Sequence, residues 1–508
     1  MKQPRFVRVR AWIAATVRPD ASMSRILSCA SLTLAILLPV TVRAMIPRAG
    51  QDSLVAASLA SLAARGARSS QSASDPRAVR ADVSRLYESR AWAPLWSTAG
   101  ALTPAALATV ASLTRIAERG LAPGDYAVAR LSQLARSPLA SVAERAEFDM
   151  TLSVATLRVL RDLYFGRVNA TEVHPTLHIA RDSVDLAAAV TQLIESGTPD
   201  SSLDAAEPRT AEYQTLKRAL AVYRARNSIA DSLALARITQ IELTLERWRW
   251  LPRTFDVPPV IVNIPAYRLG VLSNDGTTSP LSMDVVVGST TGHQTPIFAD
   301  TIRFVEFAPY WIVPLTIAKG ELLPMAMRDP HILTVNNYEI VDRRGRVMVP
   351  TVPALRKVLA GTAFIRQLPG GSNSLGRVKF LFPNVYDVYL HDSPVQADFK
   401  RIRRDQSHGC IRVADPRAMA VWLLREQPEW TGVRIDRAMT ARTPTRVPLS
   451  RGVPVYLFYA TAVADVDGGV QFHSDIYGFD ATLAAQLARR NASRAVVVES
   501  AEVVSPRQ

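Results

Sequence analysis

The chain has 508 residues, of which 48% are hydrophobic and 21% charged, a mixture that can bury a core and excludes an intrinsically disordered protein. Its formal net charge is +15, and residues 1–44 hold seven basic residues against one acidic residue, which leaves +9 for the rest. That excess favours anionic surfaces or substrates in general, but no Lys/Arg run or basic-aromatic interleaving points to nucleic acid, so we expect no nucleic-acid partner.

The N-terminus has the pattern of an export signal. Basic residues precede an apolar run from Ile26 to Val42, and Val42 and Ala44 occupy the small-residue positions of a signal-peptidase site. Residues 1–44 are therefore predicted to be a signal peptide. An uncleaved membrane anchor is the alternative, because the largely apolar run 26–42, seventeen residues long, approaches the length that spans a bilayer, and membrane contact is expected only in that case. Cleavage after Ala44 would leave Cys410 as a single thiol that cannot form an internal disulfide.

The next two segments differ in composition. Residues 45–78 are predicted to be a linker without fixed structure, because the stretch 54–77 is rich in Ala and Ser and has no aromatic anchors. From residue 79 to 252, apolar residues recur at helical spacing. In "PAALATVASLTRIAERG", residues 104–120, Pro lies near the start and Gly at the end, as helix boundaries prefer. We therefore predict an all-α domain over residues 79–252.

The pattern changes after "ERWRWLPR", residues 246–253, whose aromatic residues we expect to pack in a core or between domains. Runs such as "PPVIVNIPAYRL", "SMDVVVGS" and "VPVYLFYATAV" alternate with turn residues and predict a mostly β domain over residues 253–465. Between residues 320 and 376 the strand signal weakens in favour of short helices and loops, which indicates an inserted lid over a site. Residues 466–508 are predicted to be a C-terminal extension packed on the helical domain. The predicted fold class is therefore α+β.

One thiol and one imidazole could carry chemistry. Cys410 lies in "SHGCIRV" and His391 in "DVYLHDS", nineteen positions apart, about what a strand, a loop and a returning strand need to bring two side chains together. A thiol with an ordinary pKa of about 8.5 needs a base or local positive charge to act as a nucleophile, and His391 is the candidate base. The Asp392 carboxylate or a neighbouring backbone carbonyl could accept a hydrogen bond from the second ring nitrogen of His391 and so keep the imidazole in the required tautomer.

The residues around Cys410 fit this chemistry. Gly409 leaves room for a substrate carbonyl, and the amides of Gly409 and Cys410 could face a developing oxyanion. Arg412, on the same strand face as Cys410, could supply charge to the thiolate or to a substrate carboxylate. His408 either shapes the pocket or caps a turn. A zinc site built from His391, His408 and Cys410 is the alternative, but no CxxC or HxxxH supports it, so we expect no metal and no cofactor.

The pairing of "YLHDS" with "SHGCIRV" resembles the signature of L,D-transpeptidases, whose YkuD-type catalytic domain remodels bacterial peptidoglycan. The segments "LERWRWLP", "VVVGSTTGHQTP", "APYWIVP" and "RQLPGGSNSLGRVKFLFPN" resemble, in the same order, the larger periplasmic members of that family. The resemblance covers residues 80–490. It implies an N-terminal all-α scaffold domain followed by a mostly β YkuD-type catalytic domain with an inserted cap subdomain.

The resemblance also implies roles for individual residues. Cys410 matches the nucleophile, His391 the base, and Asp392 the position whose backbone carbonyl orients that base, while His408 and Gly409 match the pocket and oxyanion hole. The implied substrate-binding residues are Ser407, Arg412, Tyr389 and Asn373. The implied reaction is attack by Cys410 on the third residue of a peptidoglycan stem peptide, loss of the terminal D-alanine, and transfer to an amine on a second stem to form a 3-3 crosslink.

The implied location is the periplasm, and the implied partners are stem peptides and other cell-wall enzymes. Two alternatives remain. Water could resolve the thioester, which would make the protein an L,D-carboxypeptidase or muropeptide hydrolase, or the large helical half could belong to a non-catalytic wall-binding scaffold. The larger family members insert a peptidoglycan-binding module where this chain has only residues 227–245, too few to form one.

Overall fold

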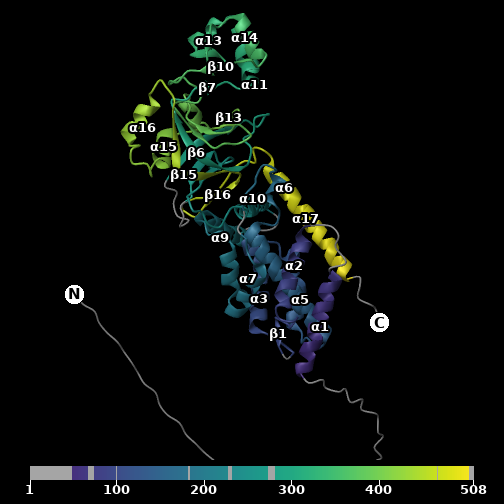
Figure 1. Cartoon of the computed structure of the whole chain (residues 1–508). Helices are drawn as coiled ribbons and strands as arrows, with labels where there is room; N and C mark the ends of the chain where they lie inside the picture. The colour runs from purple at the N-terminus through teal and green to yellow at the C-terminus, as the bar shows by residue number, and fades with distance from the viewer. Residues whose placement is uncertain are drawn as a thin grey trace, which may run out of the picture. The chain divides into compact units, whose positions relative to one another are not determined.

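The computed structural model describes residues 48–66, 74–98, 100–180, 183–226, 231–272, 281–465 and 467–502 (Figure 1). The predicted signal peptide at residues 1–44 lies outside these ranges. Within them, no helix combines the length and the apolar character that crossing a membrane requires.

The N-terminal half is helical, and helix α5 (Val142–Phe165) runs through its core. A capping box begins this helix: the Ser141 hydroxyl accepts the Glu144 N–H, and the Glu144 carboxylate accepts the Ser141 N–H. Buried side chains of α5 pack against those of the surrounding helices. The other elements are α1 (Arg48–Gly66), α2 (Ser74–Glu88), β1 (Ser97–Thr98), β2 (Ala101–Leu102), α3 (Pro104–Thr114), η1 (Ile116–Arg119), η2 (Pro123–Tyr126), α4 (Val128–Arg136), α6 (Ala170–Val173), α7 (Leu186–Ser196), α8 (Pro199–Ala206), α9 (Ala211–Arg226) and α10 (Ser232–Trp248).

The expectation that residues 45–78 lack fixed structure is wrong for α1 and for the start of α2. Val55 and Leu59 of α1 are 0% exposed in the core of the helical domain, and Arg145 of α5 donates to the Asp52 carboxylate. The physical reason is that Ala is the strongest helix former, and apolar residues four positions apart give an Ala-rich segment a stripe to bury.

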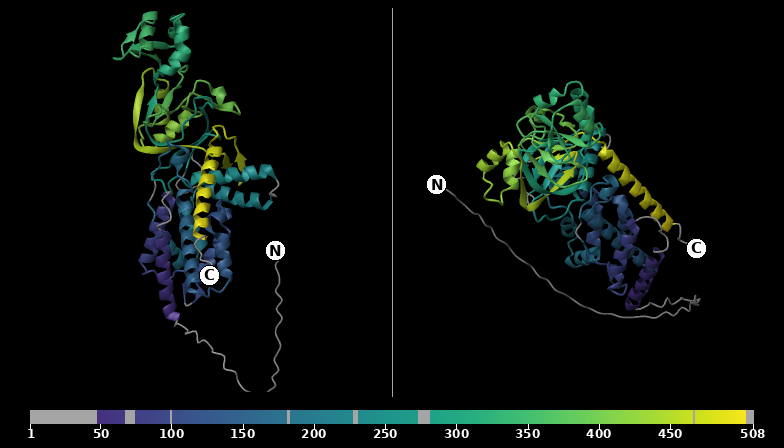
Figure 2. Two further views of the ribbon diagram at one scale, coloured as in Figure 1. Left: turned by 90° about the vertical axis from the view of Figure 1, so that its right-hand side faces the viewer. Right: turned by 45° about the horizontal axis from the view of Figure 1, so that its top comes forward.

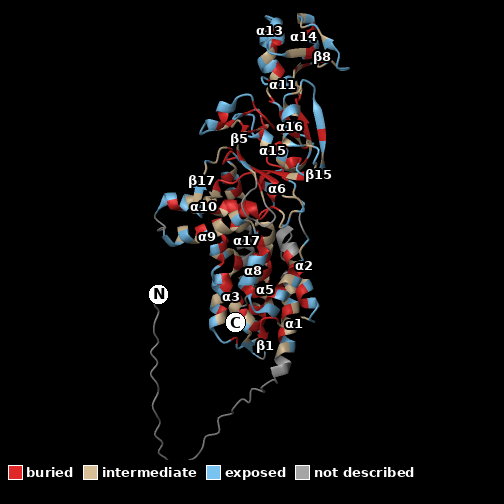
Figure 3. Cartoon of the chain, turned by 90° about the vertical axis from the view of Figure 1, so that its left-hand side faces the viewer, coloured by how far each residue is buried: buried red, intermediate tan, exposed pale blue. Residues whose placement is uncertain are grey.

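The β domain is built on a nine-stranded sheet that curls until its strands form a ring. The strand order is β13-β5-β14-β12-β11-β6-β15-β3-β4, and β4 also pairs with β5, which closes eight strands into a barrel-like sheet with β13 attached to β5. Figure 3 colours the buried residues of the chain red. The strands are β3 (Val260–Asn263), β4 (Arg268–Val271), β5 (Ser282–Gly288), β6 (Ala299–Phe307), β11 (Val378–Leu381), β12 (Leu390–His391), β13 (Asp405–Ser407), β14 (Ile411–Val413) and β15 (Thr445–Phe458).

Strand alternation places the core of this domain inside the ring. Val285 and Val287 of β5, Val305 of β6, and Phe380 of β11 are all 0% exposed and belong to one cluster. Three further helices, η4 (Gln396–Lys400), α15 (Pro416–Leu423) and α16 (Gly432–Met439), follow the later strands. The α+β fold class predicted from the sequence is confirmed.

The insertion in the β domain has a fold of its own. Four antiparallel strands in the order β7-β10-β8-β9 pack against helices around Leu355 and Ile365, which are 0% and 1% exposed. The sequence predicts short helices and loops over residues 320–376, so it misses the three strands of this sheet that follow residue 320. Its elements are β7 (Trp311–Ile312), α11 (Leu315–Ile317), the π-helical η3 (Ala318–Leu322), α12 (Leu323–Ala326), α13 (His331–Val335), β8 (Tyr338–Asp342), β9 (Val347–Met348), α14 (Val352–Leu359) and β10 (Ala363–Gln367). We call residues 311–367 the cap.

The C-terminal segment contacts both halves. After the hairpin of β16 (Ala462–Ala464) and β17 (Val470–Phe472), helix α17 (Phe479–Glu502) runs beside helices of the N-terminal half (Figure 2). Arg490 of α17 lies 2.6 Å from the Asp162 carboxylate, and Arg247 of α10 donates to Asp480 at 2.5 Å.

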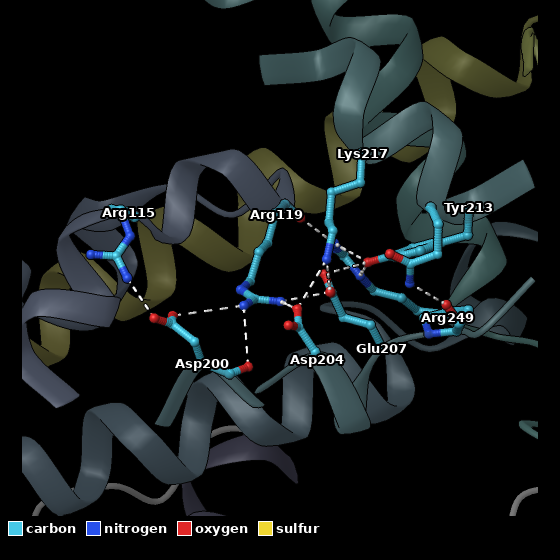
Figure 4. A network of polar contacts seen from close by, with 10 residues as sticks. Arg115, Arg119, Asp200, Asp204, Glu207, Tyr213, Lys217 and Arg249 are labelled. Atoms are coloured by element: carbon cyan, nitrogen blue, oxygen red, sulfur yellow. Dashed lines mark hydrogen bonds and ion pairs between the residues drawn. The ribbon is translucent and has the colours of Figure 1, made fainter. Parts of the chain in front are cut away.

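A buried polar network fixes the junction that follows α10 (Figure 4). The fully buried Glu207 carboxylate accepts from Arg119 at 2.6 Å, from Lys217 at 2.5 Å and from the Tyr213 hydroxyl at 3.0 Å. Arg249 donates to that same hydroxyl at 3.2 Å. Removing the Glu207 carboxylate would take a buried partner from Arg119, Lys217 and Tyr213 at once, so this side chain links the helices that carry them. Trp248 and Trp250, 3% and 2% exposed, confirm the expected packing of the aromatic stripe.

Candidate active site

Strand register brings the thiol and the imidazole to one face of the sheet. Strands β12 and β14 are parallel, with Leu390 opposite Ile411 and His391 opposite Arg412. Leu390 and Ile411 are 0% exposed and point into the core. Because side chains alternate along a strand, His391 and Arg412 lie on the opposite face, and so does Cys410, which directly precedes β14. The two candidate catalytic side chains are thus neighbours on adjacent strands.

The Cys410 thiol is largely surrounded by protein atoms, although the residue keeps some exposure to solvent. Its Sγ donates to the backbone carbonyl of Asp387 at 3.5 Å rather than to the imidazole. Burial, reinforced by the Asp387 carboxylate, raises the pKa of the thiol to about 11 against the opposing effects of the Tyr389 backbone, Arg412 and Lys379. The Cys410 side chain therefore rests as a protonated thiol at neutral pH.

The imidazole of His391 is 4% exposed and held by the backbone. Its Nδ1 lies 2.5 Å from the carbonyl oxygen of Asp392, so this nitrogen carries the proton and donates it, which leaves Nε2 as the basic nitrogen. Burial, with the charges of Arg412 and Lys379, lowers the pKa of the ring to about 3, against the backbone of Asp392 and Leu375. The sequence left open whether the carboxylate or a carbonyl orients the ring. The structure selects the Asp392 carbonyl.

The Asp392 side chain has a separate task. Its two carboxylate oxygens accept the N–H groups of Arg377 at 2.8 Å and of Ser393 at 2.7 Å. Its backbone carbonyl is the group that accepts the His391 Nδ1 proton. Gly376 packs so closely against this carboxylate that a Cβ there would lie 2.4 Å from it, and its φ is +62°. Asp392 therefore fixes the backbone that orients the imidazole.

The turn before Cys410 is tied internally. The Ser407 hydroxyl donates to the Cys410 carbonyl at 2.5 Å and accepts the Gly409 N–H at 3.1 Å. The expectation that the Gly409 amide faces an oxyanion is therefore wrong, because this donor is already used; the Cys410 amide is the remaining candidate. The φ of Gly409 is +113°, which L side chains rarely adopt, and this conformation accounts for glycine at this position.

Arg412 and Tyr389 flank the pair. Arg412 donates to the Asp398 carboxylate of η4 at 3.1 Å, so its charge is shared while it remains on the face of Cys410. The Tyr389 ring lies 5.9 Å from the His391 ring in an edge-on arrangement, and Lys379 Nζ lies 5.7 Å from the centre of the Tyr389 ring. Arg412 and Tyr389 both remain candidates for contact with a substrate.

His408 contacts the cap. Its Nε2 lies 3.0 Å from Oε1 of Glu321 in η3, and its ring centre lies 4.8 Å from that of His293. The side chains of His408 and Glu321 are 43% and 56% exposed, so the contact adds little stability, but it joins the cap to the turn that carries Cys410. This arrangement turns His408 toward the carboxylate and not into a three-ligand set with His391 and Cys410. Within the described ranges, no cluster of His, Cys, Asp and Glu suits a metal ion.

Two residues predicted to bind substrate do not face an open site. Asn373 is 0% exposed, and its carboxamide nitrogen donates to the Pro309 carbonyl at 3.1 Å and the Leu368 carbonyl at 2.9 Å, where the chain leaves and re-enters the β domain around the cap. Ser407 is 3% exposed and engaged within its own turn. Both predictions are corrected: these polar groups are saturated by the backbone and hold loops in place.

The sequence reasoning missed three residues near the pair. Asp387 supplies the carbonyl that accepts the thiol, and Lys379 adds positive charge beside it. Thr295 donates from its hydroxyl to the Gly409 carbonyl at 2.8 Å. Only the position of Thr295 in the quoted "VVVGSTTGHQTP" segment could have drawn attention to it, because its partner lies more than a hundred positions away.

Comparisons with known proteins agree with this architecture. Residues 259–452 match the family model described as the L,D-transpeptidase catalytic domain, and residues 81–220 match the one described as a scaffold domain. A Haemophilus influenzae protein with the printed name "Putative L,D-transpeptidase" is 32% identical over 244 residues, which are 48% of this chain and 48% of that protein. The chain thus spans about half the length of this curated relative.

Proposed function

Since this chain belongs to the L,D-transpeptidase family through its catalytic domain at residues 259–452 and its scaffold domain at residues 81–220, we propose that it is a cysteine-dependent L,D-transpeptidase that forms 3-3 peptidoglycan crosslinks. The observation that carries the proposal is the common sheet face of Cys410 and His391 on neighbouring strands.

The first half-reaction is acylation. As Cys410 Sγ attacks the carbonyl carbon of the third residue of a tetrapeptide stem, the basic nitrogen of His391 takes the thiol proton. The C–S bond forms, the C–N bond to the terminal D-alanine breaks, and the same proton passes to the leaving amine. A neutral imidazole and a protonated thiol suit this concerted transfer, because the resting site then holds no thiolate exposed to side reactions. In free enzymes catalytic hydrogen bonds are often loose and tighten when substrate binds.

The second half-reaction is transfer. An amine on a second stem attacks the thioester, its proton passes to His391, and the Cys410 thiolate leaves and recovers the proton. Water in place of the amine would give a tripeptide product. The Arg412 guanidinium on the same face is suited to hold a substrate carboxylate.

Product analysis tests the reaction. Purified protein incubated with a disaccharide-tetrapeptide should give a crosslinked dimer lacking one D-alanine, detected by mass spectrometry, and Cys410→Ala should give none. Tripeptide alone would overturn transfer in favour of hydrolysis. Absence of any product, together with absence of a covalent carbapenem adduct on Cys410, would favour a non-catalytic wall-binding protein.

A substitution tests the base. His391→Ala should lower the acylation rate by roughly 10²- to 10⁴-fold, the usual contribution of general acid–base catalysis. His178→Ala, which removes an exposed imidazole from the helical half, serves as the control and should acylate normally. An unchanged rate in a folded His391→Ala protein would remove His391 from the mechanism.

We also propose that the protein works in the periplasm, where its substrate lies. The support is the basic and apolar pattern of residues 1–44. Fractionation of cells that express the full chain should recover the protein in the periplasm or, if the leader is retained, on the inner membrane. Recovery in the cytosol would contradict this.

A further inference from the structure

The peptide group that precedes the proposed nucleophile is held by a buried hydroxyl. Thr295 is 0% exposed, and its Oγ1 donates to the Gly409 carbonyl at 2.8 Å. The same oxygen accepts the Gly288 N–H at 2.8 Å. A hydroxyl has one proton to donate, and the Gly288 contact directs that proton to Gly409.

Fixing this carbonyl also fixes the amide of Cys410. The Gly409 C=O and the Cys410 N–H belong to one planar trans peptide unit, so they point in opposite directions and turn together. The Cys410 N–H is the candidate oxyanion donor that remains, because Ser407 occupies the Gly409 N–H. Thr295, which is itself buried, therefore sets the direction of this donor through the Gly409 carbonyl.

Tyr477 closes the arrangement from the C-terminal segment. Its hydroxyl donates to the Gly288 carbonyl at 2.6 Å and accepts the Thr295 N–H at 3.2 Å. Tyr477 therefore holds together the backbones of Gly288 and Thr295, the two residues that the Thr295 hydroxyl also joins. Tyr477 is 8% exposed and lies beyond residues 259–452, the stretch that matches the catalytic domain. Gly288 makes the close fit possible, because a Cβ there would lie 2.0 Å from the His293 carbonyl.

Tyr477 is in turn held by its own segment. Its N–H donates to the Tyr459 hydroxyl at 2.9 Å, and that hydroxyl donates to Asp475 at 2.5 Å. The other Asp475 oxygen accepts the Asp480 N–H at 3.0 Å, and Asp480 receives Arg247 of α10. Hydrogen bonds therefore lead from the scaffold side to the peptide group beside Cys410.

We propose that Thr295 and Tyr477 are positioning residues for the reaction, which orient the Cys410 amide toward the oxyanion that forms during acylation. This inference rests on the proposed function. It assigns a role in the reaction to Tyr477, which lies beyond residues 259–452 and whose burial alone would suggest only a structural role.

The test separates oxyanion stabilisation from thiol access in the full-length protein. A carbapenem acylates Cys410 through a tetrahedral oxyanion, whereas iodoacetamide alkylates it by displacement and needs no oxyanion donor. Thr295→Val and Tyr477→Phe should lower the limiting acylation rate constant roughly 10- to 100-fold, as misoriented catalytic groups do, with an unchanged half-saturating concentration and an unchanged alkylation rate. Thr295→Ser keeps the hydroxyl and should restore most of the rate.

Tyr87→Phe is the matched control. Tyr87 is 0% exposed in the helical half, and its hydroxyl donates to the Asp149 carboxylate at 2.6 Å, so the variant loses a comparable buried hydrogen bond remote from Cys410. Its acylation rate should equal that of the unmodified chain. Thermal unfolding of each variant shows that it is folded at the assay temperature.

Two outcomes would overturn the inference: Thr295→Val acylating at the original rate, or acylation and alkylation falling by the same factor, which would indicate general disorder of the site. The proposed function fails in a different way. In that case the unmodified chain itself would resist the carbapenem while iodoacetamide still labelled Cys410.

Discussion

At the scale of single residues, burial sets the chemistry of the site more than neighbouring charge does. Desolvation is the largest cause of both shifts, which lower the pKa of His391 to about 3 and raise that of Cys410 to about 11. Arg412 and Lys379 favour the thiolate but disfavour an imidazolium, so their effects on a charged pair oppose each other and burial decides the outcome. The site therefore rests as two neutral groups, unlike cysteine sites that store a thiolate–imidazolium pair.

This state has a consequence for pH dependence. Alkylation of Cys410 by iodoacetamide should keep rising through pH 9, by roughly tenfold per pH unit below the thiol pKa, because only the thiolate reacts. Site-resolved mass spectrometry measures the rate, and Cys410→Ala gives the background from Cys29 if the leader is retained. A plateau between pH 6 and 8 would show a preformed ion pair instead.

At the scale of elements, the cap depends on the loop that returns it to the β domain. The Asn373 carboxamide joins Pro309 before the cap to Leu368 after it, and its Oδ1 accepts the Leu375 N–H at 2.8 Å. The cap strands pair with one another and with no strand of the barrel-like sheet among the described residues. Contacts at its base, with the exposed pair of Glu321 and His408, therefore link the cap to the β domain and to the turn that carries Cys410.

Removing the carboxamide should loosen this base. Asn373→Ala leaves several buried backbone groups unpaired and should destabilise the protein by about 1–3 kcal/mol, with faster hydrogen exchange in cap amides. Asn336→Ala, which removes an exposed carboxamide from the cap, should change stability by about 0.5 kcal/mol or less. Equal effects of the two substitutions on cap exchange would contradict the assigned role of Asn373.

The sequence predicts the elements that carry local signals. The segment "DVYLHDS" places His391 on a strand, as the structure has it. The cap strands escape prediction because each is short and half-exposed, so packing within the cap decides their conformation. The occupied Gly409 amide and the saturated Asn373 depend on partners distant in sequence, and no local pattern reports such contacts.

At the scale of the whole molecule, one buried imidazole lies where the halves meet. His174 follows α6, is 3% exposed, and packs against Trp250 and against Phe479 of the C-terminal segment, with ring centres 6.0 and 4.8 Å away. Burial, aided by Arg247, lowers its pKa to about 3. Its Nε2 has no hydrogen-bond partner among the described residues, so protonation there would place an unpaired charge in the junction.

Acid should therefore weaken the folded protein. Well above pH 6.5 both His174 and His391 are neutral in the folded and unfolded states. As the pH falls from 6.5 toward 3, only the unfolded chain binds these protons, and each group removes up to about 1.4 kcal/mol of stability per pH unit. Urea midpoints at pH 7 and 4.5 measure the loss. His174→Phe keeps the ring packing and should show a smaller difference, and an undiminished one would assign the acid sensitivity elsewhere.

The closed ring of strands has one more consequence, for behaviour at high concentration. Because β4 returns to β5, the large sheet ends only at β13, which has three residues, and the cap sheet ends at β7 and β9, which have two residues each. A neighbouring copy would find almost no free row of amides and carbonyls on which to add a strand. Among the described residues, the two large sheets of the β domain thus offer little template for aggregation.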